Sequence, residues 1–266
     1  MEKKIFLYSN GRRASIECED MFRRKIPDIG LSIIDEYSPD ADLLICIGGD
    51  GTFLEALHKF KFPQMPIIGI NTGHLGFFQE LMPDQLDYLL SEFKAEHYKL
   101  QPMSTAEIEI QTSVGKYRHM GLNEVVIRSP NNHTIHLDIS IDGVFMQRFS
   151  GDGVVVSTPA GSTAYNYSLG GSIVDPRLML LQLTPIAPMN TTAYRSFTSS
   201  ILIPSDLKFG LVPEVDSASA ITVVYDGYSA NYTDVREMNV TYSPVKVHLV
   251  RFDRYDFWTK VKSKFL

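Results

Sequence analysis

The residues best suited to chemistry form the loop GGDGT, residues 48–52, between an apolar stretch at 43–47 and an amphipathic stretch at 53–60. Glycines let a backbone approach an anion closely, and the free N–H groups at a helix start attract negative charge. A carboxylate beside a phosphate is unfavourable unless it takes a proton from an attacking hydroxyl or meets a metal-bound phosphate. The loop therefore predicts phosphoryl transfer that uses Asp50, and the alternative is that Asp50 only caps the helix.

Two further segments have the polar groups of a ligand site. SGDG, residues 150–153, leads into a stretch at 157–172 that is rich in small residues, where Tyr165 offers a flat face for an adenine or nicotinamide ring. Asn123 and Glu124 place an amide beside a carboxylate, which can hydrogen-bond sugar hydroxyls or a base edge. The alternatives are a polar loop and an exposed turn. Two Gly-Asp-Gly loops in one chain nevertheless indicate a ligand cleft.

The elements that must position these segments change in character near residue 98. Before it, strand-like stretches at 5–8, 43–47 and 67–70 alternate with helix-like stretches at 14–26, 53–60 and 83–97. This alternation is typical of an α/β domain with a parallel sheet. After residue 98 stretches with a period of two dominate, and the Asp-Gly pairs at 142–143 and 226–227 fit type I′ hairpin turns. The second region is therefore predicted to be mostly β.

Composition excludes several classes of protein. The 266 residues include 25 basic and 31 acidic side chains, a formal charge of −6, which argues against a dedicated duplex DNA binder. The two cysteines and seven histidines show no zinc-binding spacing. The apolar stretch near the N-terminus is too short for a signal peptide or a membrane span. We expect a cytoplasmic protein with neither nucleic acid nor membrane as a partner.

In chain order, GGDGT, GINTGHLGFF, LNE and GDGVVVSTPAGSTAYNYSLGG resemble the NAD kinases, especially the short bacterial type. The resemblance implies phosphorylation of the 2′-hydroxyl of the adenosine ribose of NAD to give NADP. The phosphate donor would be ATP or polyphosphate, and the cofactor a divalent cation such as Mg²⁺. It also implies an α/β nucleotide-binding domain over 1–98 to which residues 250–266 return, and a β-rich NAD-binding domain over 99–249. Relatives assemble as homodimers or homotetramers.

The resemblance also assigns roles to single residues. Asp50 would be the general base. The residues expected to contact NAD or ATP are Gly51, Phe77, Asn123, Glu124, Ser150, Asp152, Thr163, Ala164, Tyr165, Ser168 and Ala187. Among them, Phe77 would lie beside the adenine, Asn123 and Glu124 would hold a base edge and a ribose, and Asp152 would meet the nicotinamide amide. No metal ligand is assigned.

Two other functions remain open from the sequence. A lipid or sphingosine-type kinase would share the GGDG loop and also use Asp50. A non-catalytic module that senses NAD or NADP would share the ligand segments. Neither would make NADP from NAD and ATP.

Overall fold

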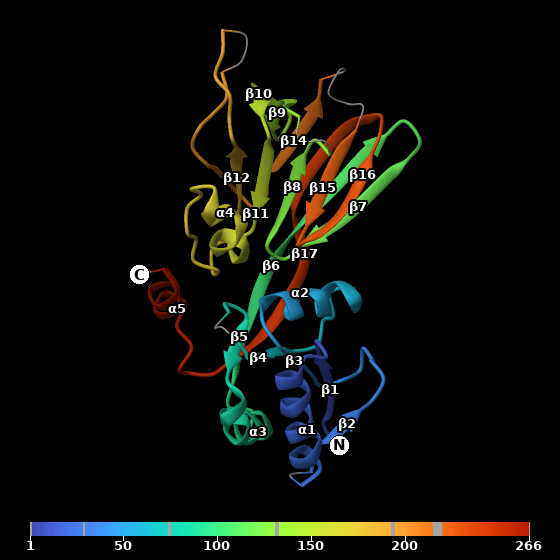
Figure 1. The fold of residues 1–266 in the computed structure, drawn as a ribbon, viewed down its shortest axis with the longest axis vertical. Coiled ribbons are helices and arrows are strands. Elements are labelled where there is room, and N and C mark those ends of the chain that lie inside the picture. Colours follow the sequence, from blue (N-terminus) through green and yellow to red (C-terminus); the bar gives the residue numbers. More distant parts are fainter. Residues whose placement is uncertain are drawn as a thin grey trace. The chain divides into compact units, whose positions relative to one another are not determined.

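The computed structural model describes residues 2–28, 30–73, 76–130, 133–192, 195–214 and 220–265. The chain forms two units, one of residues 1–103 with 246–266 and the other of residues 104–245. It passes from the first to the second within β6 (Lys99–Thr112) and returns within β17 (Val235–Arg251) (Figure 1). The predicted return of the chain end to the first unit is confirmed.

The first unit is built on a parallel sheet, as the alternating pattern predicts. Its strands lie in the order β2-β1-β3-β4, and β5 pairs with β4. All these pairs are parallel. The bounds are β1 (Lys4–Ser9), β2 (Ser32–Ile34), β3 (Leu43–Ile47), β4 (Ile67–Ile70) and β5 (Gln79–Leu81). The end of β17 adds a further parallel partner for β4, with Leu249 opposite Ile67.

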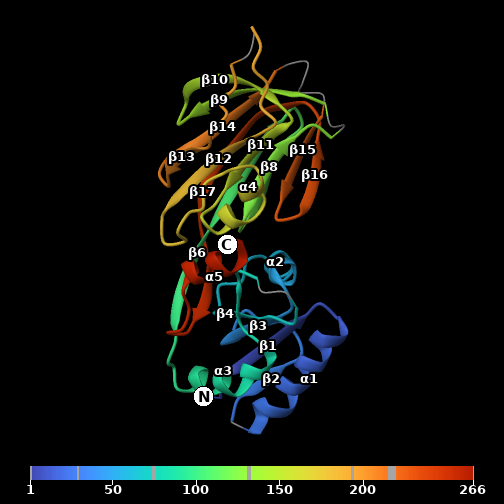
Figure 2. The ribbon, with the colours of Figure 1, turned by 60° about the vertical axis from the view of Figure 1, so that its left-hand side comes forward.

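Helices cover both faces of this sheet (Figure 2). α1 (Arg13–Asp28) and α3 (Leu86–Lys94) share one apolar cluster with Ile5 and Leu7 of β1. A 3₁₀ turn at Pro83–Gln85 precedes α3. Because side chains alternate along a strand, Phe6 and Tyr8 point to the other face, where both rings contact Phe60 at the end of α2 (Asp50–Lys59). A last helix, α5 (Phe257–Phe265), completes the unit.

The second unit is a sandwich of two sheets around one apolar core. One sheet has the order β13-β12-β11-β8-β15-β16, and the other the order β10-β9-β14-β17-β6-β7. Buried side chains of both sheets form a single cluster, which includes Phe149 and Phe209 from one sheet and Val154 and Leu183 from the other. The mostly β character predicted after residue 98 is confirmed.

The bounds of its remaining elements are β7 (Lys116–Gly121), β8 (Glu124–Arg128), β9 (Ile135–Ile141), β10 (Val144–Gly151), β11 (Gly153–Ser157), η2 (Ala160–Thr163), α4 (Tyr165–Ser168), β12 (Leu180–Ile186), β13 (Ile201–Pro204), β14 (Lys208–Pro213), β15 (Ile221–Tyr225) and β16 (Tyr228–Tyr232). Both Asp-Gly hairpins are present, and their four residues have positive φ angles, as type I′ turns require. Within the described part of the chain, no helix is both long and apolar enough to cross a membrane.

Candidate functional site

The GGDGT loop joins β3 to α2, and Asp50 is the first residue of that helix. The loop begins with Gly48 at a φ angle of +155°, where a Cβ atom would overlap with the side chain of Thr52. Glycine is therefore required at this bend. Asp50 does not cap α2, because its carboxylate turns away from its own helix to another backbone segment. The capping alternative for Asp50 is wrong.

Two backbone N–H groups hold the Asp50 carboxylate. Phe77 donates to Oδ2 and Phe78 donates to Oδ1, each at 3.0 Å. A Cβ atom on Gly76 would overlap with both the Asp50 carboxylate and the side-chain amide of Gln79, so this glycine leaves the room that the carboxylate occupies. Each carboxylate oxygen keeps a second lone pair. The result is a partly exposed carboxylate with a fixed orientation and free capacity to accept a proton.

The C-terminal helix also reaches this carboxylate. Lys264 of α5 lies 3.8 Å from Asp50 Oδ2, and its ammonium is 4.6 Å from the centre of the Phe77 ring. Phe257 and Phe265, also of α5, contact the same ring at centroid distances of 6.2 and 5.8 Å. Phe77 is consequently only 8% exposed. The structure thus brings Asp50, Gly51 and Phe77 together. It also adds α5, whose residues carry no motif that indicates a functional role.

A second polar centre surrounds Asn123 and Glu124 in the other unit. The backbone N–H groups of Leu122 and Asn123 donate to the two carboxylate oxygens of Asp226 at 2.6 and 2.7 Å. Asp226 belongs to the β15–β16 turn. Its Asp-Gly pair predicted the turn, but nothing local predicted that the carboxylate would hold a segment about a hundred residues away.

The loop after β11 packs against the same segment. Thr158 donates from its hydroxyl to the carbonyl of Leu122 at 2.5 Å and from its N–H to the carbonyl of Asn123 at 2.9 Å. A Cβ atom on Gly161 would overlap with the carbonyl of Asn123, so the two backbones meet at a glycine. These contacts bring the start of η2 against Asn123, and Thr163 is the last residue of η2.

Asn123 and Glu124 each carry a buried oxygen that lacks a hydrogen-bond partner among the described residues, Oδ1 of Asn123 and Oε2 of Glu124. The two side chains are 8% and 9% exposed. Burial, reinforced by the charge of Asp226, raises the pKa of Glu124 to about 8. Buried polar atoms are normally paired, so two unpaired oxygens on adjacent residues indicate a ligand with hydrogen-bonding groups.

The other predicted site residues are spread over the same unit. Tyr165 and Ser168 are exposed on α4, which Asn166 anchors by accepting a hydrogen bond from the Thr184 hydroxyl at 2.6 Å. Ala164 immediately precedes this helix.

Asp152 lies where the chain crosses from β10 in one sheet to β11 in the other. Its N–H donates to the carbonyl of Ile186, next to the exposed Ala187, whose φ angle is +44°. Ser150 is 2% exposed, and its N–H and carbonyl both bond the hydroxyl of Ser196. Asp152 and Ala187 are therefore neighbours, whereas Ser150 is held within β10.

The two carboxylate oxygens of Asp50 could bind a divalent cation that enters together with a nucleotide. Among the described residues, no group of three or more His, Cys, Asp or Glu side chains is placed to hold a metal. Magnesium is commonly held by one or two carboxylates together with substrate phosphates and water. Asp50, with free lone pairs on both oxygens, fits such a role.

Comparisons with known proteins agree with this geometry. The N-terminal domain of the ATP-NAD kinase family matches residues 6–98, and its C-terminal domain matches residues 122–252. The NAD kinase of Finegoldia magna is 38% identical over 99% of this chain and 98% of its own length. NAD kinase 1 of Oceanobacillus iheyensis is 34% identical over 98% of this chain and 97% of its own length.

Two solved structures resemble the fold. The NAD kinase from Archaeoglobus fulgidus in complex with ATP has a TM-score of 0.75 and 25% identity, with 98% of each chain covered. The yeast NADH kinase complexed with NADH has a TM-score of 0.80 and 21% identity, with 99% of this chain and 87% of that chain covered, and it shows the fold alone. With both family domains matched in order and relatives above 30% identity along the whole chain, this protein belongs to the ATP-NAD kinase family.

Proposed function

We propose that this protein is an NAD kinase, which transfers the γ-phosphoryl group of ATP to the 2′-hydroxyl of the adenosine ribose of NAD. The products are NADP and ADP. The observation that carries the proposal is the Asp50 carboxylate at the start of α2, which two backbone N–H groups hold with free lone pairs. The family match supports this reaction over a lipid kinase or a sensing module.

Asp50 acts as the general base. A ribose hydroxyl is a weak nucleophile near neutral pH, so a fixed carboxylate that accepts its proton helps the oxygen attack phosphorus. As the new O–P bond forms, the bond between the γ-phosphorus and the β,γ-bridging oxygen breaks, and ADP leaves. The N–H groups of the GGDGT loop at the start of α2 face the phosphates, and Gly51 contributes there. A divalent cation bound to the phosphates of ATP would neutralise phosphate charge.

NAD binds to the β-rich unit in this proposal, and the α/β unit supplies the phosphoryl-transfer residues. The unpaired oxygens of Asn123 and Glu124 support a base edge and a ribose hydroxyl as the bound groups. Phe77 is assigned to the adenine. The further proposed contacts to the dinucleotide are Ser150, Asp152, Thr163, Ala164, Tyr165, Ser168 and Ala187.

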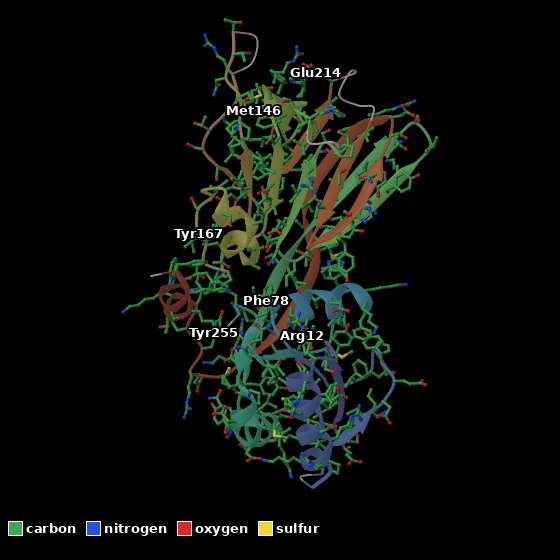
Figure 3. All side chains as sticks on the ribbon, in the orientation of Figure 1. Arg12, Phe78, Met146, Tyr167, Glu214 and Tyr255 are labelled. Carbon is green, nitrogen blue, oxygen red and sulfur yellow. The ribbon has the colours of Figure 1, made fainter. Side chains whose placement is uncertain are left out.

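We also propose that the protein forms a homodimer or homotetramer. Met146, labelled in Figure 3, belongs with Val144 and Phe145 to an apolar group on β10, and these three side chains are 49%, 66% and 61% exposed. β10 is the last strand of its sheet, and an exposed apolar edge strand is a ready partner for a second copy. The proposed location is the cytoplasm, which holds both substrates.

Formation of NADP from NAD, ATP and magnesium tests the proposed function. The reaction should be run with ATP or polyphosphate as the donor, and with sphingosine or a diacylglycerol as a competing acceptor. We expect NADP with ATP, and no phosphorylated lipid. A phosphorylated lipid without NADP would favour the lipid kinase, and no product with tight NAD binding would favour the sensing module.

A further inference from the structure

The C-terminal helix holds the backbone segment that orients Asp50. Lys260 of α5 donates hydrogen bonds from its ammonium to the carbonyl of Gln79 and, at 3.4 Å, to the carbonyl of Phe77. The same short segment donates the N–H groups of Phe77 and Phe78 to the Asp50 carboxylate. Its carbonyls are thus fixed by a lysine, while its N–H groups fix the carboxylate.

We propose that Lys260 is a positioning residue for phosphoryl transfer, which keeps the N–H donors of residues 77 and 78 aligned on Asp50. This inference rests on the proposed function, because Asp50 must be the reacting base for its alignment to matter. Lys260 touches the peptide segment and acts on Asp50 only through it. A misplacement of about 1 Å at a reacting group can cost on the order of 10²-fold in rate, so a small shift of the segment is sufficient.

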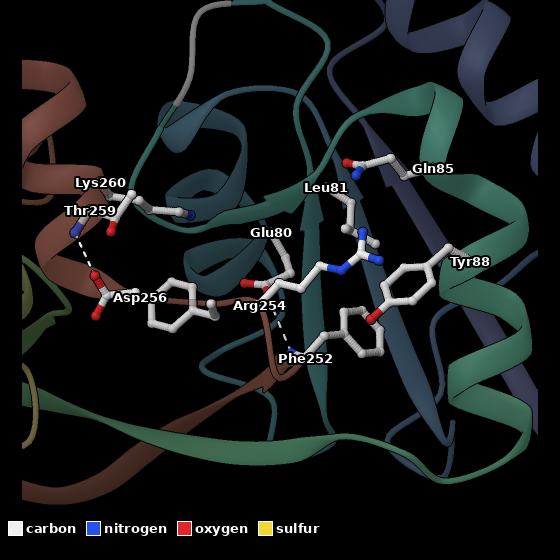
Figure 4. Close-up of a pocket in the computed structure, with 10 residues that line it drawn as sticks. Glu80, Leu81, Gln85, Tyr88, Phe252, Arg254, Asp256, Thr259 and Lys260 are labelled. Atoms are coloured by element: carbon white, nitrogen blue, oxygen red, sulfur yellow. Dashed lines mark hydrogen bonds between the residues drawn. The ribbon is translucent and has the colours of Figure 1, made fainter.

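Buried charged side chains and an aromatic ring surround Lys260. Arg251 and Glu80 form an ion pair of 2.8 Å whose side chains are 6% and 4% exposed, beside the same segment. Arg251 lies 3.7 Å and Lys260 5.0 Å from the centre of the Tyr255 ring. Lys260, Glu80, Arg254 and Tyr255 line a cavity of about 160 Å³. Figure 4 shows Lys260, Glu80 and Arg254 at this cavity.

The charge of Lys260 changes within an accessible pH range. Burial, with a smaller contribution from Arg251, lowers the pKa of Lys260 to about 8. The charged groups that act on it from the surrounding elements are Arg251 of β17, Glu80 of β5, Asp50 of α2 and Lys264 of α5. Charge-assisted hydrogen bonds are about twice as strong as neutral ones. The hydrogen bonds from Lys260 to the carbonyls of Phe77 and Gln79 therefore weaken as pH rises through about 8.

Three variants of the full chain test the proposal. Lys260→Met removes the charge and keeps a stem of similar length, Lys260→Arg keeps a charge that does not titrate below pH 10, and Lys262→Met is a control on the exposed side of α5. We expect Lys260→Met to lower kcat by about 10–100-fold, with the KM for NAD changed less than about twofold. Lys262→Met should leave both parameters within about twofold of the wild type.

The pH profile separates a positioning role from a merely structural one. The wild-type kcat should fall above pH 8, and Lys260→Arg should retain its kcat to pH 9.5. If Lys260→Met has a normal kcat, or if Lys260→Arg and the wild type decline together, the proposal is wrong. If Lys260→Met does not fold, the pH dependence of kcat in Lys260→Arg, compared with that of the wild type, is sufficient to test the proposal. A wild-type enzyme that makes no NADP would instead refute the proposed function.

Discussion

Glu124→Gln removes a titrating group from a buried position without changing its shape. In the folded protein the pKa of Glu124 is raised to about 8, mainly by burial, from an ordinary value of 4.5. The folded protein therefore holds a proton between pH 4.5 and 8 that the unfolded chain has lost. This stabilisation is fully present below pH 4.5, and it is lost as pH rises through 8. Glutamine does not titrate, so the variant lacks this dependence.

The size of the effect follows from the shift. At about 1.4 kcal/mol per pKa unit, the change from 4.5 to about 8 corresponds to roughly 5 kcal/mol of unfolding free energy. With about 2–4 °C per kcal/mol, the wild-type Tm should fall by on the order of 10 °C relative to Glu124→Gln between pH 5 and pH 9. Glu237→Gln, at an exposed carboxylate of the same unit, is the matched control and should follow the wild type.

Thermal unfolding of the three proteins, monitored at intervals of half a pH unit without ligand, measures this difference. Saturating NAD should reduce the difference in Tm between the wild type and Glu124→Gln at high pH. The reason is that a hydroxyl that donates to the unpaired Oε2 stabilises the ionised carboxylate. If the Tm curves of the wild type and Glu124→Gln stay parallel from pH 5 to pH 9, then Glu124 is ionised in the folded protein over this range, which contradicts its raised pKa.

Two further substitutions probe the two polar centres. Gly76→Ala places a Cβ atom against the Asp50 carboxylate. We therefore expect kcat to fall at least tenfold and the stability to fall by about 1–3 kcal/mol. A normal kcat in steady-state assays would show that the Asp50 carboxylate does not need the room beside Gly76. Asp226→Asn presents an NH₂ group to a backbone N–H, at a cost of about 1.5–3 kcal/mol. It should weaken NAD binding in calorimetry and reduce the pH dependence of Tm, and unchanged affinity would show that Asp226 does not position Asn123 and Glu124.

Features encoded by local pattern could be predicted from the sequence. The apolar stretches at 43–47 and 67–70 are the strands β3 and β4 residue for residue, because buried parallel strands are continuous apolar runs. The Asp-Gly hairpins followed because only a few residue types tolerate positive φ at both turn positions. Between the one-turn helix α4 and β12 the chain is irregular, and such a stretch has no periodicity from which it could be predicted.

Features that depend on contacts between distant parts of the chain could not be predicted. Asp226 holds the backbone of Leu122 across 104 residues, and Lys260 reaches the carbonyl of Gln79 across 181 residues. Neither contact leaves a periodicity or motif near either partner. The sequence could therefore identify Asp50 and Glu124 as candidates, but not the groups that orient them or shift the pKa of Glu124.

The turnover of Asp50→Asn in NADP synthesis, measured together with NAD affinity and Tm, tests the role of Asp50 as the general base. Asparagine keeps the size of the side chain and removes the proton acceptor. Because the new NH₂ group faces one of the two backbone N–H donors, the variant should lose about 1.5–3 kcal/mol of stability. We expect it to fold and bind NAD with nearly the affinity of the wild type, with a kcat lowered by about 10²–10⁴-fold, the usual range for a lost general base. A kcat near that of the wild type in a folded variant that binds NAD would show that Asp50 is not the base.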